Sequence, residues 1–184
     1  ICNLACIHCP HPEFKSSALY GARSLDPELN KKLVNEVRES GHGITQYIRY
    51  TGEGEPLIHP RIFEMMKYAV DHSGVPVSLT TNGTILNEER VEKLLACGVD
   101  VVDISIDAFT PQTYETIRVR GDLEVTRRNV MTLLRLREEA PKRTQVVVSY
   151  VEQPQNQHET EDFEEFWKNQ GCDFVVIRRL HSSA

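Results

Sequence analysis

Short runs of β-branched and other apolar residues alternate with amphipathic segments along nearly the whole chain. We expect strands at residues 44–50, 75–80, 99–107, 144–151 and 174–177. Near-continuous apolar strands that alternate with amphipathic helices indicate a parallel sheet covered by helices. The pattern therefore predicts an α/β fold with five strands, and we expect one further strand before Ile1.

The segments between these strands carry signals for helix starts and ends. Helix-capping residues, two of them followed by proline, stand at Asp26-Pro27, Asn87, Thr110-Pro111 and Asp122. Further helices are predicted to open at Pro60 and to span residues 160–169. Such capping residues satisfy the free N–H groups of a first helical turn. Gly98 suits the end of the helix that follows Asn87.

Length and composition are those of one globular domain, residues 1–184, with 40% apolar and 26% charged residues. The chain starts at Ile1 rather than at a methionine, so we expect it to be part of a longer protein. Its net charge of −6 argues against a broad nucleic-acid surface, which needs clustered Lys and Arg. No apolar run approaches the roughly 20 residues of a membrane span, and no signal peptide is visible.

Three of the five cysteines, Cys2, Cys6 and Cys9, crowd the start of the chain. Thiolates at this spacing can converge on one centre if the segment forms a loop. An iron–sulfur cube held by three cysteines has one iron without a protein ligand, and that iron can bind a substrate or cofactor. Cys97 and Cys172 lie in apolar surroundings, and we predict that they are buried apolar residues rather than ligands.

Polar residues gather where the predicted strands end. The segment TGEGEP spans residues 51–56, TTNG spans residues 80–83, and Ser105 and Asp107 close the next strand. Functional groups of parallel α/β folds collect at the carboxyl ends of the strands. We therefore expect one open cleft above the sheet.

The three-cysteine loop C-x3-C-x2-C, the GEP motif and the TNG motif, in this order, resemble the radical S-adenosylmethionine (SAM) superfamily. The resemblance extends from Cys2 to about His181. It implies a partial (β/α)6 TIM-like barrel, with a parallel sheet, outer helices and a first strand that largely precedes this sequence. It also implies that Cys2, Cys6 and Cys9 hold a [4Fe-4S] cluster that binds SAM. In this superfamily the reduced cluster cleaves SAM to a 5′-deoxyadenosyl radical, which takes hydrogen from a substrate.

The same resemblance suggests residues for the SAM site. Glu55 would pair with the SAM ammonium, next to Gly54, which permits close backbone approach, and Pro56, which stiffens the loop. Asn82 and Ser105 would hydrogen-bond the ribose or carboxylate of SAM.

Four further positions are candidates in that comparison. Asp107 would bind SAM or cap the turn before the next helix. Arg118 and Arg120 could hold a carboxylate by a bidentate contact, although surface or ion-paired roles are the commoner ones for such arginines. His8 replaces the usual aromatic residue before the third cysteine and would lie beside the adenine.

Other readings of the cysteine loop remain open. It could be a structural zinc site with His8 or His11 as fourth ligand. It could also belong to an electron-transfer module, although such a cluster normally has all its irons ligated, and no fourth cysteine lies near the loop. A scaffold without chemistry would not explain the polar strand ends. Glu55 discriminates best, because a pure relay needs no carboxylate for an amine.

The substrate is less well defined than the cofactors. The segments NLACIHCPHP and RRLH resemble superfamily members with a C-terminal SPASM extension, many of which act on peptides and others on small molecules. The resemblance further implies an electron donor such as flavodoxin or ferredoxin and a reducing cytoplasm. His181 and Tyr150 are candidate substrate contacts by their position at strand ends.

Overall fold

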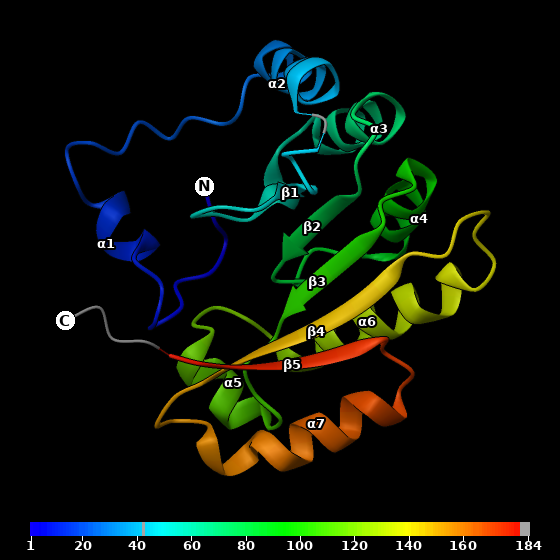
Figure 1. The fold of residues 1–184 in the computed structure, drawn as a ribbon. Coiled ribbons are helices and arrows are strands. Elements are labelled where there is room, and N and C mark those ends of the chain that lie inside the picture. The colour runs from blue at the N-terminus through cyan, green and yellow to red at the C-terminus, as the bar shows by residue number, and fades with distance from the viewer. Residues whose placement is uncertain (42, 181–184) are drawn as a thin grey trace.

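The computed structural model describes residues 1–41 and 43–180, and its centre is a parallel sheet in the order β1-β2-β3-β4-β5 (Figure 1). The strands are β1 (Ile48–Tyr50), β2 (Val77–Thr81), β3 (Val101–Ser105), β4 (Gln145–Glu152) and β5 (Phe174–Arg179). All four strand pairs are parallel. The predicted α/β fold with five parallel strands is confirmed. The strand expected before Ile1 lies outside this sequence, and both it and the longer protein stay predictions.

Seven α-helices connect and cover the described strands. They are α1 (His11–Lys15), α2 (Pro27–Ser40), α3 (Ile62–His72), α4 (Glu88–Cys97), α5 (Pro111–Ile117), α6 (Leu123–Arg137) and α7 (Thr160–Asn169). Two short 3-10 helices, η1 (Pro56–Ile58) and η2 (Gln157–Glu159), follow β1 and β4. Only α1, a single short turn after the cysteines, was not expected from the sequence.

The predicted caps form at the starts of the helices. The Asp26 carboxylate accepts the N–H groups of Glu28 and Leu29, at 2.9 and 3.0 Å. Asn87 and Asp122 cap α4 and α6 in the same way. Gly98 ends α4 with φ of 74°, a left-handed conformation that costs glycine little. Local sequence therefore sets most of the helix boundaries.

All five strand predictions differ from the observed strands at one end or both. The strand predicted from Ile44 begins only at Ile48, because the N–H groups of Ile44 and Thr45 turn back to the carbonyl of Gly41. The strand predicted to end at Asp107 ends at Ser105, and Asp107 turns to φ of 64°. The strand predicted at 75–80 is Val77–Thr81. Apolar composition alone does not reveal where the neighbouring strand stops pairing.

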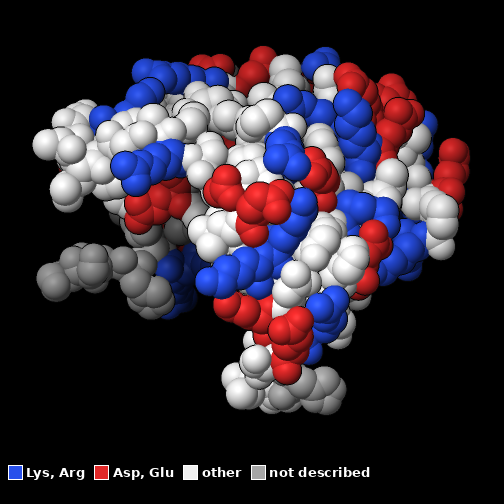
Figure 2. Space-filling view, turned by 90° about the horizontal axis from the view of Figure 1, so that it is seen from above, with Lys and Arg blue, Asp and Glu red and all other residues white. Residues whose placement is uncertain are grey.

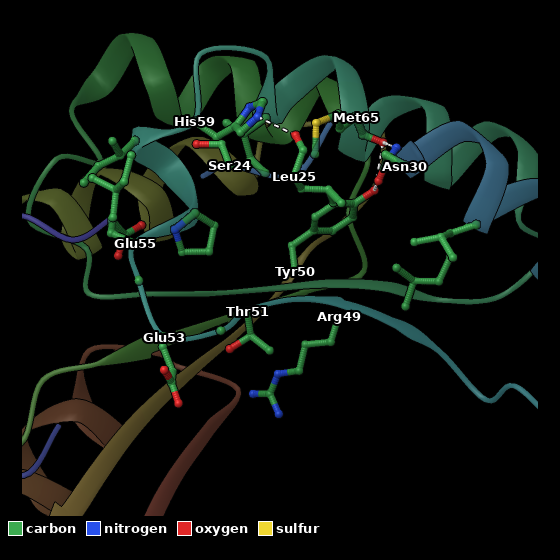
Figure 3. Close-up of a pocket in the computed structure, with 18 of the residues that line it drawn as sticks. Ser24, Leu25, Asn30, Arg49, Tyr50, Thr51, Glu53, Glu55, His59 and Met65 are labelled. Carbon is green, nitrogen blue, oxygen red and sulfur yellow. Dashed lines mark hydrogen bonds between the residues drawn. The ribbon is translucent and has the colours of Figure 1, made fainter. Parts of the chain in front are cut away.

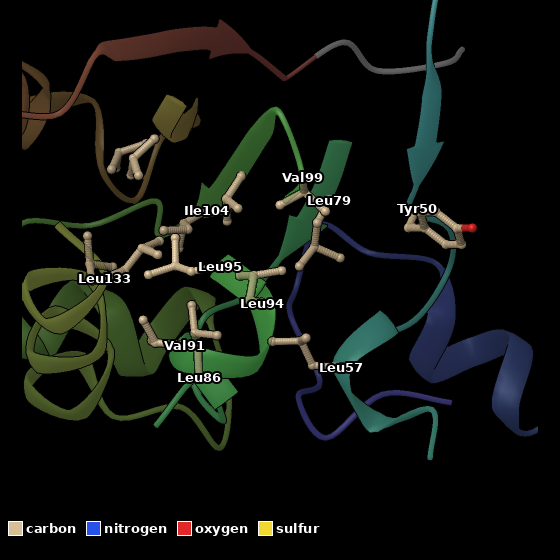
Figure 4. Close-up of a cluster of buried hydrophobic side chains, with 14 of the residues drawn as sticks. Tyr50, Leu57, Leu79, Leu86, Val91, Leu94, Leu95, Val99, Ile104 and Leu133 are labelled. Carbon is tan, nitrogen blue, oxygen red and sulfur yellow. The ribbon is translucent and has the colours of Figure 1, made fainter. Parts of the chain in front are cut away.

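The two faces of the sheet differ in character. Paired residues of a parallel sheet point to the same side, so the register places Tyr50, Leu79 and Ile104 on one face. Helices α3, α4, α6 and α7 cover this face, and Figure 4 shows its side chains meeting those of α4. The core therefore lies between the sheet and the helices.

The opposite face, called the open face here, carries polar side chains. The register places Arg49, Thr80, Asp103 and Ser149 on it, with Ser105 further along β3. Its apolar members are half-buried or exposed, whereas most of those on the core face are buried. The cysteine segment and α1 lie near the carboxyl ends of the strands (Figure 1), as expected for a cleft there.

Charge is mixed on the surface seen in Figure 2, where acidic and basic side chains are interspersed. The described residues on that side form no broad basic surface of the kind that binds nucleic acid. Among the helices that the structure describes, none has the length and apolar content needed to span a bilayer.

Leu94 lies fully buried in α4, and its truncation to alanine should leave a cavity in the core. We expect Leu94→Ala to lower the free energy of unfolding by about 3 kcal/mol, measured by urea denaturation. Leu29→Ala is the control, because Leu29 is 46% exposed and should change stability by less than about 1 kcal/mol. Equal losses in the two variants would contradict this description of the core.

Candidate active site

The cysteine loop, residues 1–9, is held in place by backbone hydrogen bonds to two distant segments. Ala5 and Ile7 donate their N–H groups to the carbonyls of Val119 and Ile117, both at 3.0 Å, at the end of α5. The carbonyl of Ile1 accepts the N–H of Glu55 at 2.9 Å. The loop thus has a fixed position over the carboxyl ends of the strands without help from its thiols.

Gly54 permits the contact between the cysteine loop and the GEP loop. A Cβ at this position would lie 2.6 Å from the carbonyl oxygen of Ile1, far inside van der Waals contact. Any side chain would therefore push Ile1, and with it Cys2, away from Glu55. The predicted role of Gly54 in close backbone approach has a specific physical cause, although the partner is the cysteine loop itself.

Glu55 is a buried carboxylate with three hydrogen-bond donors. Its Oε1 accepts the hydroxyl of Thr81 at 2.6 Å and the N–H of Leu57 at 3.1 Å, and its Oε2 accepts the N–H of Asn82 at 2.7 Å. Burial raises the pKa of Glu55 above its ordinary value, and these hydrogen bonds oppose the rise. Glu55 therefore joins the GEP loop to the TNG loop, a connection that the sequence did not reveal.

Asn82 extends this connection back to the cysteine loop. Its Nδ2 donates to the side-chain oxygen of Asn3 at 3.0 Å, and Asn3 in turn donates to the hydroxyl of Thr84 at 2.8 Å. Asn82 Oδ1 also accepts the N–H and hydroxyl of Thr84. The three motifs that the sequence singled out therefore meet in one hydrogen-bonded unit. Asn3 was missed, because nothing in its spacing distinguishes it from other loop residues.

A buried ion pair lies next to the middle cysteine. Arg118 is 7% exposed, and its Nη2 lies 2.5 Å from Oδ2 of Asp107, while its Nη1 lies 3.7 Å from the sulfur of Cys6. Burial raises the pKa of the Cys6 thiol, and the positive charge of Arg118 opposes that rise. A cation beside a sulfur favours the thiolate form that binds metals.

Asp107 connects this ion pair to β4 and to His8. Its Oδ1 accepts the N–H of Val151 at 2.7 Å, and its main-chain carbonyl accepts Asn156 Nδ2 at 2.8 Å. His8 Nε2 lies 3.5 Å from Oδ2 of Asp107, and burial lowers the pKa of His8. Asp107 is fully buried, and all its contacts are to the protein, so its visible role is to orient Arg118 and His8.

The remaining predicted residues lie in different settings. Pro56 begins η1, directly after Glu55. Ser105 lies half-buried at the end of β3, on the open face. Arg120 is exposed at φ of 74°, and the described residues form no ion pair with it, so its predicted role stays a prediction. His181 lies outside the described residues.

Of the two cysteines predicted to be buried outside the loop, Cys97 is buried, whereas Cys172 is half-buried at the edge of the core. Cys97 is 5% exposed, and its thiol donates to the carbonyls of Phe63 and Lys93. Burial raises the pKa of Cys97 to about 11 and that of Cys172 to about 12. Protonated thiols of this kind are poor metal ligands.

The donor set of the loop, three free thiols beside a buried cation, fits an iron–sulfur cluster. Cys2, Cys6 and Cys9 are free thiols on one anchored loop, and Arg118 offsets negative charge there. Among the described residues, no three His, Cys, Asp or Glu side chains gather closely enough to hold one metal ion. His11, a candidate zinc ligand, is buried with Nε2 lacking a hydrogen-bond partner in the described part of the chain.

A cavity of about 390 Å³ borders the GEP loop on the helix side of β1 (Figure 3). Its lining is mainly apolar and includes Tyr50, whose hydroxyl donates to Asn30 Oδ1 at 2.7 Å. Glu55 reaches this cavity, but none of the three cysteines lines it. Of the candidate cofactor residues, Gly54, Glu55 and Pro56 line this cavity, whereas His8, Asn82, Ser105 and Asp107 do not.

Comparison with known proteins agrees with this arrangement. The family description "Radical SAM superfamily" matches residues 1–166. The chain belongs to the radical SAM superfamily. Members of this superfamily are enzymes that use a [4Fe-4S] cluster and SAM, as the sequence predicted.

Two curated relatives illustrate the range of the superfamily. An AdoMet-dependent heme synthase of Methanosarcina barkeri is 38% identical over 117 residues, which are 64% of this chain and 31% of the relative. A probable GTP 3′,8-cyclase of Methanothermobacter marburgensis is 28% identical over 183 residues, 100% of this chain and 56% of the relative. The chain thus spans between about a third and about half of the relatives it matches.

Solved structures share the fold at lower sequence identity. The enzyme anSMEcpe with bound AdoMet superposes with a TM-score of 0.74 and 18% identity, over 97% of this chain and 48% of that one. SuiB of Streptococcus suis, bound to its precursor peptide SuiA, gives 0.73 and 16% identity, over 98% and 37%. The fold is therefore that of TIM-barrel-like radical SAM enzymes.

Replacement of Cys2, Cys6 or Cys9 by alanine should each abolish cluster assembly, because the loop provides only three thiolates. We expect iron and acid-labile sulfide to fall to background in these variants after anaerobic reconstitution, measured by colorimetric analysis. Cys97→Ala and Cys172→Ala are the controls and should retain the iron content of the parent. Iron loss in either control would show that the ligand assignment is wrong.

Glu55→Gln should destabilise the loops even without any cofactor. The amide NH2 would face donors where the carboxylate now accepts three hydrogen bonds, so we expect a loss of about 1–3 kcal/mol in unfolding free energy. The matched control is Glu53→Gln, two residues away on the exposed side of the same loop. Denaturant titration should give a lower free energy of unfolding for Glu55→Gln than for Glu53→Gln. Equal free energies would contradict the bridging role of Glu55.

Proposed function

We propose that the whole protein is a radical SAM enzyme and that residues 1–180 form its cofactor-binding core. The observation that carries this proposal is the hydrogen-bonded unit of cysteine loop, GEP loop and TNG loop, joined through Ile1, Glu55, Asn82 and Asn3. A structural metal site would not require a buried carboxylate and an amide from two successive strand ends to meet the cysteine loop.

We assign the following roles to residues of this chain. Cys2, Cys6 and Cys9 would hold the [4Fe-4S] cluster. When bound and reduced, that cluster supplies the electron that cleaves SAM into methionine and a 5′-deoxyadenosyl radical, which takes hydrogen from the substrate. Arg118, oriented by Asp107, places a positive charge beside Cys6.

The SAM contacts follow the sequence predictions. A carboxylate has about four acceptor sites, and Glu55 uses three of them within the protein, so one remains for the SAM ammonium. Asn82 and Ser105 would contact the ribose or carboxylate, and His8 would lie beside the adenine. Arg120 would join them only if its exposed side chain turned toward the cleft.

Radical SAM enzymes need a substrate and a reductant, and we infer a peptide or small-molecule substrate above the open face of the sheet. A flavodoxin or ferredoxin would supply the electron, in a reducing cytoplasm. SuiB, which shares the fold, binds a precursor peptide, whereas the curated relatives are named for heme synthesis and GTP cyclisation. A C-terminal SPASM extension is part of this proposal.

The deciding experiment is anaerobic reconstitution followed by dithionite reduction and electron paramagnetic resonance, with and without SAM. We expect the signal of the reduced cluster to change when SAM is added, and 5′-deoxyadenosine to form. Glu55→Gln should weaken SAM binding by about tenfold or more through loss of a charge-assisted contact. A cluster signal that does not change when SAM is added would favour the electron-transfer alternative. Zinc in place of iron in the protein would favour a structural site.

A further inference from the structure

All five described strands contribute to a charged network on the open face. Arg49 on β1 reaches Asp103 on β3, with 2.5 Å between Nη2 and Oδ2, and its Nε donates to the hydroxyl of Thr80 at 2.8 Å. Ser149 on β4 donates its hydroxyl to the other oxygen of Asp103. Arg178 on β5 donates to Ser149 Oγ at 2.6 Å and lies 3.5 Å from Asp103 Oδ2.

The charges of this network do not balance. One carboxylate lies between two guanidinium groups, which leaves a formal charge of +1. The Asp103 side chain is 6% exposed, whereas those of Arg49 and Arg178 are 36% and 46% exposed. The anion is therefore buried beneath the two cations, and the network presents positive charge outward.

Both arginines also keep hydrogen-bond donors that the network does not use. A guanidinium carries five N–H bonds in a planar fork that matches a carboxylate or phosphate. Arg49 directs two nitrogens to Thr80 and Asp103, and Arg178 directs two to Ser149 and Asp103. The unused N–H groups of these two exposed arginines can therefore donate hydrogen bonds to an oxyanion.

The network occupies the surface on which a substrate would lie. Figure 3 shows Arg49 on the side of β1 opposite Tyr50, away from the helices. Ser105, a predicted SAM contact, is on the same face two residues beyond Asp103. Other charges near these strands are Glu53 in the GEP loop and the pair Glu152–Arg179, which the register places on the helix-covered side.

We propose that Arg49 and Arg178 bind an oxyanion group of the substrate, a carboxylate or a phosphate, on the open face of the sheet. Asp103 and Ser149 position the two guanidinium groups. The inference rests on the proposed function, since it concerns the substrate of the same site. It narrows that substrate from any peptide or small molecule to one with an anionic group near the hydrogen that is removed.

The competing explanation is that the network has only a structural role and links the strands from β1 to β5. The two explanations predict different changes in anion affinity for one variant. Asp103→Asn keeps an oxygen for the hydroxyl of Ser149 but removes the negative charge, so it should tighten anion binding if the arginines are a binding site. A purely structural network would gain no affinity from this change.

The test is calorimetric titration of the reconstituted, SAM-saturated full-length protein with inorganic phosphate and, separately, with acetate. We expect Arg49→Gln and Arg178→Gln each to weaken binding of the preferred anion by about tenfold, and Asp103→Asn to strengthen it by several-fold. Arg135→Gln is the control, because Arg135 is 58% exposed and pairs with Glu88 on the helical surface, and it should leave affinity unchanged. The tighter of the two probes identifies the oxyanion as phosphate or carboxylate.

Several results would overturn the proposal: no binding of either anion to the parent, an equal loss in Arg135→Gln, or weaker binding in Asp103→Asn. Arg49→Gln and Arg178→Gln should keep the SAM-dependent change in the cluster signal, which shows that they remain folded. Absence of that change in the parent protein would count against the proposed function, whereas the anion titration, repeated without SAM, addresses the substrate site separately.

Discussion

The buried carboxylate of Glu55 is the contact on which the rest of the site depends. The carboxylate oxygens accept hydrogen bonds from the GEP loop and from the TNG loop. The backbone N–H of Glu55 donates to the carbonyl of Ile1, at the start of the cysteine loop. Burying a charged carboxylate is costly unless donors surround it, so the three donors are required for the loop to fold this way. One residue thereby fixes the relative positions of three segments that are up to 80 residues apart in the chain.

A second buried charge supports the opposite side of the cysteine loop. Arg118 and Asp107 are both nearly inaccessible, and removal of either would leave an uncompensated charge in the interior. The same α5 end that carries Arg118 also offers the carbonyls of Ile117 and Val119 to the loop. Cys6 therefore lies between backbone anchors and a cation, a setting that would suit its proposed role as a cluster ligand.

Polar character divides the sheet into an apolar face covered by helices and a polar open face. Fully buried apolar residues on the helix side supply the hydrophobic stabilisation, so the open side is free to carry serines, threonines and the Arg49–Asp103–Arg178 network. Reactive radical chemistry needs an enclosed space beside the target bond. In the proposed enzyme, the open face would form one wall of such a space, with the positive charge of Arg49 and Arg178 on it.

The sequence by itself determined the element types, their order and most helix starts, because hydrophobic period and capping residues act locally. It also identified Cys2, Cys6, Cys9 and Glu55 as candidates, since their motifs are contiguous. Only the tertiary structure decided that Glu55 bridges to Asn82, that Asp107 orients Arg118, and that Arg120 is exposed. These outcomes depend on strand register and on which backbone segments approach each other. Contacts such as Asn3–Asn82, 79 residues apart, leave no periodic trace in the sequence.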